Sequence, residues 1–65
     1  MKVDDKYKLK MKVITKGGDY FEKDEIVLYN GYHSTAKNLH EFVSLDYQSF
    51  LVFPVSQINK FLEKL

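Results

Sequence analysis

Apolar residues and lysines alternate strictly in the first part of the chain, over residues 7–13 (YKLKMKV). This period of two is typical of a strand with one buried face and one wet face, because a helix would scatter the lysines around its axis. We therefore expect a strand near 6–15. A turn at 17–19 (GGD), where glycine supplies positive φ, leads into a short strand near 19–22.

Two apolar runs farther along the chain predict strands near 26–30 and 50–53. The first run (IVLY, then Asn) is β-branched and aromatic, which favours a strand. The second run reads FLVF without interruption, which is the pattern of a strand buried on both faces. Pro54 then ends it, since proline has no N–H to donate to a ladder.

The dipeptide Asn-Gly at 30–31 predicts a hairpin with a type I′ turn, in which both central residues need positive φ. The next strand is then expected at 32–35 or, where the polar residues 34–38 form a loop, at 39–45. Another turn is expected at 46–49 (DYQS).

The end of the chain has helical spacing and predicts a short helix near 56–64, with Ser56 as its N-cap. Its apolar stripe is Ile58, Phe61, Leu62 and Leu65. A helix this short is marginal by itself, so the stripe is expected to be buried, most simply as a plug in the open end of a barrel.

These elements predict a mainly β fold in a single domain over residues 1–65, which is a small five-stranded antiparallel barrel or bent sheet with a short C-terminal α-helix. Closure of such a sheet removes exposed edges. Two stretches resemble SH3-like barrels. Residues 21–27 (FEKDEIV) are similar to the diverging turn of that fold, and residues 53–58 (FPVSQI) to its closing strand and helical turn.

The resemblance implies the SH3-like barrel but not its proline-rich ligand. Peptide-binding SH3 domains carry an acidic, aromatic-rich loop early in the chain and a tryptophan after the third turn, and this chain has a lysine-rich first strand and no tryptophan. It resembles in type the small SH3-like barrels encoded by phages and mobile elements of A/T-rich bacteria. Its basic residues are all lysines and arginine is absent, which suits an A/T-rich genome.

The net charge of +1 is unevenly spread along the chain. Residues 1–16 hold six lysines and two aspartates, whereas residues 17–65 hold four lysines and seven acids. With no cysteine, disulfides and thiolate metal sites are excluded. No apolar run approaches the roughly 18–20 residues of a membrane span, and no secretory signal opens the chain, so a cytoplasmic protein without a membrane partner is expected.

Three groups of side chains are candidates for binding a partner. A row of lysines on the first strand (Lys6, Lys8, Lys10 and Lys12) has the spacing to follow a phosphate backbone, although lysines on an edge strand also block edge-to-edge pairing. Turn tyrosines (Tyr20, Tyr29 and Tyr32) are expected as an exposed cluster for bases or a protein. An acidic set (Asp19, Glu22, Asp24 and Glu25) suits a basic partner surface or is a solvated loop.

No catalytic, cofactor or metal site is predicted. His33 and His40 match no zinc spacing and are expected on the surface. Nothing resembles a nucleophile elbow or a glycine-rich phosphate loop. The first hypothesis is therefore a non-catalytic protein-interaction module, such as a phage-type regulator or inhibitor of a host protein. The alternatives are a nucleic-acid-binding small barrel that uses the lysine row, and a structural subunit of a small oligomer, with a homodimer left open as a stabiliser.

Overall fold

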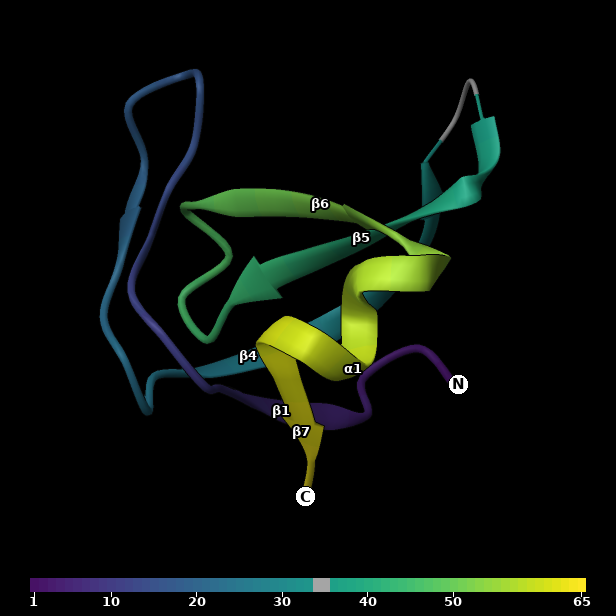
Figure 1. The fold of residues 1–65 in the computed structure, drawn as a ribbon, viewed down its shortest axis with the longest axis horizontal. Coiled ribbons are helices and arrows are strands. Elements are labelled where there is room, and N and C mark those ends of the chain that lie inside the picture. The colour runs from purple at the N-terminus through teal and green to yellow at the C-terminus, as the bar shows by residue number, and fades with distance from the viewer. Residues whose placement is uncertain (34–35) are drawn as a thin grey trace.

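The computed structural model describes residues 1–33 and 36–65, and its main element is a five-stranded antiparallel sheet that curls into half of a barrel (Figure 1). The strand order is β6-β5-β4-β1-β7. The sheet strands are β1 (Lys6–Leu9), β4 (Ile26–His33), β5 (Ala36–Ser44), β6 (Phe50–Pro54) and β7 (Leu62–Lys64). A separate hairpin pairs β2 (Val13–Ile14) with β3 (Tyr20–Phe21), and a helical segment comprises η1 (Val55–Gln57) and α1 (Ile58–Phe61). The mainly β, antiparallel fold with a short C-terminal helix is confirmed.

The core lies on the concave face of this sheet and is rich in aromatic rings. Phe42 is fully buried at its centre, with ring centroids 5.4 Å from Tyr7, 5.5 Å from Tyr29 and 6.1 Å from Phe53, all edge to face. Such contacts add to the burial of apolar area. The cluster consists of Tyr7, Leu9, Phe21, Val27, Tyr29, Phe42, Leu51, Phe53, Ile58 and Leu62. It draws on both sheets and on the helical segment, so one core holds the described elements together.

The predicted single strand over 6–15 is wrong beyond Leu9. The Leu9 N–H donates to Glu25 at 2.9 Å, and the Leu9 carbonyl accepts from Asp24 at 2.8 Å. Its neighbours β4 and β7 start at Ile26 and Leu62, so the chain beyond Lys10 has no strand on either side and leaves the sheet. It pairs again only as β2.

The hairpin that β2 forms with β3 agrees with the predicted turn and with the short strand near 19–22. The Thr15 N–H donates to Asp19 at 2.9 Å, and Gly18 has a φ of 92°. Phe21 at the end of β3 is fully buried, which fixes the base of the hairpin to the core.

Asn30 and Gly31 do not form the predicted hairpin turn; they lie inside β4, at a bulge. The pairing runs from Tyr29↔Phe42 to Tyr32↔His40, so β4 contains one residue more than β5 in this interval. A bulge accepts the extra residue, and Gly31 supplies a positive φ (96°) there, whereas Asn30 lacks the positive φ that a type I′ turn also needs. The following strand is β5 at 36–44, close to the second of the two predicted alternatives. Of the predicted loop 34–38, residues 36–38 belong to β5 and residues 34–35 lie outside the described residues.

Replacing Gly31 by alanine is expected to destabilise the fold by about 1–2 kcal/mol, the cost of a left-handed conformation for a residue with a Cβ. A Cβ at this position would meet only Val3 Cγ2 at 4.0 Å, so backbone strain alone is measured. Urea denaturation followed by circular dichroism gives the free energy of unfolding. Gly17→Ala is the control, since Gly17 lacks a positive φ. Equal effects of the two substitutions would contradict the bulge.

The expectation that 50–53 is buried on both faces is wrong, because β6 is an edge strand. Only β5 pairs with it, and its residues alternate between exposed and buried. Leu51 and Phe53 point into the core, and Phe50 and Val52 lie on the other face. Pro54 is its last residue, as predicted. The predicted turn before it is present, with Tyr47 at a φ of 59°.

The predicted helix over 56–64 ends early, at Phe61. Leu62 has extended backbone angles (φ −130°, ψ 146°) and begins β7, where it pairs with Leu9. The apolar stripe is therefore divided: Ile58 and Leu62 are in the core, whereas Leu65 is 58% exposed. Ser56 is not an N-cap, since neither η1 nor α1 has a side-chain cap hydrogen bond.

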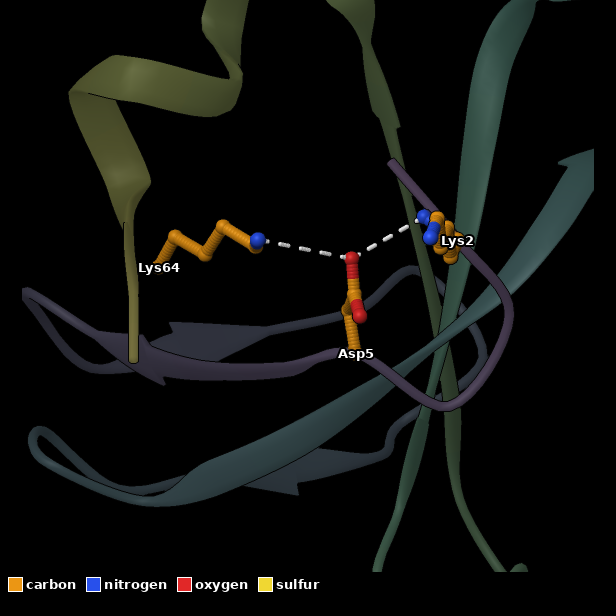
Figure 2. A network of polar contacts seen from close by, with 3 residues as sticks. All are labelled: Lys2, Asp5 and Lys64. Atoms are coloured by element: carbon orange, nitrogen blue, oxygen red, sulfur yellow. Dashed lines mark hydrogen bonds and ion pairs between the residues drawn. The ribbon is translucent and has the colours of Figure 1, made fainter.

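A small polar contact joins the start of the chain to β7 (Figure 2). Asp5 Oδ2 accepts a hydrogen bond from the Lys2 N–H at 3.0 Å and lies 3.7 Å from Lys64 Nζ. The Lys2 hydrogen bond, helped by the Lys64 charge, holds the pKa of Asp5 below its usual range although partial burial opposes this. The contact is exposed, so its contribution to stability is small. It accompanies the pairing of β1 with β7.

Candidate functional site

The predicted lysine row does not form a continuous line. Lys6 and Lys8 are on β1, whereas Lys10 and Lys12 lie after the point where the chain leaves the sheet. Lys10 Nζ donates to the Asn59 carbonyl at 2.6 Å, and Lys12 Nζ sits 5.9 Å from the centroid of the Tyr20 ring. The edge-protection interpretation is also wrong, because β1 lies between β4 and β7.

The expected exposed cluster of three tyrosines is not formed either. Tyr29 is buried, and its hydroxyl shares a hydrogen bond of 2.8 Å with His40 Nδ1. Burial raises the pKa of Tyr29. Tyr20 and Tyr32 are exposed, but β3 and the last residues of β4 lie on opposite sides of the molecule (Figure 1).

The two predicted surface histidines have different outcomes. His40 is buried in contact with Tyr29 and Tyr32, so the expectation is wrong for this residue; the Tyr32 ring centroid lies 4.9 Å away. The side chain of His33 lies outside the described residues. Among the side chains that the structure describes, no three His, Cys, Asp or Glu are placed to hold a metal ion.

The acidic set divides between two turns. Glu22, Asp24 and Glu25 belong to the turn between β3 and β4, where Glu25 Oε1 accepts from the Glu22 N–H at 3.0 Å. Asp19 lies in the turn of the β2–β3 hairpin, directly before β3. The carboxylate of Glu25 therefore acts within its own turn, and only Asp19 lines the hollow described next.

A hollow of the described surface lies between the β2–β3 hairpin and β6, and we call it the seam groove. It has a volume of about 530 Å³. It is lined by Val13, Ile14, Thr15, Lys16, Gly17, Asp19, Phe50, Leu51, Val52 and Phe53. In Figure 1 the hairpin (blue) stands beside one end of β6 (green), and no strand pairing joins the two. The seam groove is thus the side on which the half-barrel stays open.

The wall formed by β6 offers unpaired backbone groups. The Ser44 N–H donates to the Ser49 carbonyl at 2.9 Å, and Phe42 is in register with Leu51. Because backbone groups alternate in direction along an antiparallel strand, Leu51 and Phe53 bond to β5. The N–H and carbonyl of Phe50 and of Val52 therefore face the open edge.

The side chains of the seam groove are apolar and accessible. Phe50 is 46% exposed, Val52 is 37% exposed, and Ile14 on the opposite wall is 63% exposed. Edge strands are commonly protected by charge or by short length. The other edge, β7, has both, since it has three residues including Glu63 and Lys64. β6 has no charged residue, so it lacks this protection on the side that faces the seam groove.

The two charged residues that line the seam groove are on the hairpin wall. Lys16 and Asp19 give one charge of each sign, whereas Lys12 lies over Tyr20 and is not part of the lining. β6 adds no charge. The seam groove is therefore apolar at its centre, and its two lining charges offset each other.

Sequence reasoning missed this site because its two walls are far apart in the chain. The available signal is the run of uncharged apolar residues at 50–53, a pattern that is also typical of a fully buried strand. No family model, curated protein or solved structure matches this chain. Within residues 1–33 and 36–65, no helix has the length and apolar character needed to cross a membrane.

Proposed function

We propose that this protein is a non-catalytic protein-interaction module that binds its partner in the seam groove. The observation that carries the proposal is the uncharged edge strand β6, which presents Phe50 and Val52 beside an open hollow. Exposed apolar surface of this kind marks protein-binding sites on small domains. The partner would cover side chains that the rest of the fold leaves in water.

An SH3-like relationship remains part of the proposal. The turn between β3 and β4 and the helical segment after β6 support it, since they lie in the two stretches, 21–27 and 53–58, whose sequences resemble that fold. A regulator or inhibitor that acts by occupying a partner, of the phage-encoded type, is the role we propose. The nucleic-acid alternative has less support, because the lysines are distributed over separate places.

The expected result of panning a random peptide library on the immobilised protein is a set of enriched peptides that need the seam groove. We expect Val52→Lys to weaken their binding about tenfold or more, because it places a charge in the apolar centre of the site. Lysine is well tolerated on an edge strand, so the fold should persist. Fluorescence anisotropy with labelled peptides measures the change.

Val55→Lys is the matched control, since Val55 is 58% exposed in η1 and does not line the seam groove. It should leave the affinity unchanged. If no peptide is enriched, or if the enriched peptides bind Val52→Lys as tightly as the unmodified protein, the seam groove is not the binding site and the proposal fails.

A further inference from the structure

We infer that the occupant of the seam groove is one extended protein segment that adds to the edge of β6 as a further strand and places apolar side chains beside Phe50 and Val52. This inference rests on the proposed function and specifies its partner. Pairing along a sheet edge obtains affinity from backbone hydrogen bonds and specificity from alternate side chains.

The backbone of β6 is suited to strand addition over a short length. Phe50 and Val52 each direct one N–H and one carbonyl to the open edge, and Pro54 has a carbonyl but no N–H. Pairing therefore ends at Pro54. A guest strand would bond through alternate amides, and its side chains would lie beside those of Phe50 and Val52.

The geometry favours an isolated segment over the β6 of a second copy. Neighbouring strands lie about 4.8 Å apart, and the β6 of a second copy would bring its own β5 on its other side. In the seam groove that side is occupied by the hairpin wall, with Val13 and Ile14. A single strand brings no further strand with it, so it avoids this conflict with the hairpin wall.

The lining indicates the chemistry of the segment. β6 contributes no charge, and Lys16 and Asp19 on the hairpin wall offset each other. An apolar, extended segment therefore complements both walls. A charged side chain held against Phe50 and Val52 would lose hydration without gaining a partner, which gives the site selectivity.

Strand addition is tested with the peptides enriched in the panning experiment, resynthesised in two N-methylated forms. One form carries methyl groups on every second backbone amide, and the other carries them on the intervening amides. We expect one form to lose about tenfold or more in affinity and the other to keep it, because only one set of amides bonds to β6. Equal affinity of the two forms overturns the inference.

Amide hydrogen exchange by NMR gives an independent measure on the protein. Addition of the unmethylated peptide is expected to slow exchange at the Phe50 and Val52 amides about tenfold, since they gain hydrogen bonds. Unchanged exchange at both amides would count against strand addition. It would leave the proposed function standing if Val52→Lys still abolished binding, so the two ideas can fail separately.

Light scattering on the free protein tests whether a second copy of this chain is the occupant instead. A dimer in which the Phe50 and Val52 amides are already protected would show that a second copy fills the seam groove, and would overturn the inference.

Discussion

Replacing Phe42 by alanine is expected to leave the domain largely unfolded at room temperature. The Phe42 ring is fully buried and contacts Tyr7, Tyr29 and Phe53. Removal of a buried phenylalanine side chain costs about 3–5 kcal/mol, because it loses burial and leaves a cavity. The core of a domain of 65 residues rarely supplies more than about 3–5 kcal/mol of stability, so this loss takes most or all of it.

Urea denaturation monitored by circular dichroism measures the free energy of unfolding of the variant. Phe50→Ala is the matched control, because it removes the same ring from a half-exposed position. Its cost should be about 1 kcal/mol or less. If the two variants unfold at similar urea concentrations, the concave face of the sheet is not the core of the protein.

Leu62→Ala is expected to destabilise the fold by about 2–5 kcal/mol, whereas Leu65→Ala should change it by no more than about 0.5 kcal/mol. Leu62 is 2% exposed and pairs with Leu9, but Leu65 lies beyond β7 and is mostly in water. A helix through 56–64 would instead place both leucines on one buried stripe. The pair of variants therefore distinguishes β7 from a continued helix.

The same denaturation experiment serves both leucine variants. Glu63→Ala, between them, controls for a general effect of alanine in this segment, since Glu63 is exposed. Similar losses for Leu62→Ala and Leu65→Ala would show that the helix continues and that β7 does not form in solution.

The local patterns of the sequence predicted those features that depend on neighbouring residues. Backbone geometry and hydrogen-bonding capacity account for the alternation over 7–9, for the glycine turn before β3 and for the end of β6 at Pro54. The mainly β class follows from several such segments together. These properties need no knowledge of distant partners.

The errors arose where a distant partner decides between structures that the local sequence allows equally. The alternation continues to Val13, but the strand ends at Leu9 because β4 and β7 supply no residues beyond it. Asn30-Gly31 satisfies a bulge as well as a turn, and pairing with β5 selects the bulge. Leu62 has helical spacing, yet pairing with β1 makes it extended.

The candidate site was the least predictable part. Its walls come from 13–19 and 50–53, and nothing in either segment alone indicates that the two face each other. The lysines and tyrosines suggest binding surfaces because their side chains are chemically distinctive. Their positions on the curved sheet separate them, and Tyr29 is used in the core.

The most direct test of the central claim is an NMR titration of nitrogen-labelled protein with an enriched peptide, mapped residue by residue. Binding in the seam groove predicts that the largest amide shifts fall in 13–17 and 50–53, with small shifts in the acidic turn at 22–25. Large shifts at 22–25 or along β1 at Lys6 and Lys8, with 50–53 unchanged, would contradict the assignment of the binding site.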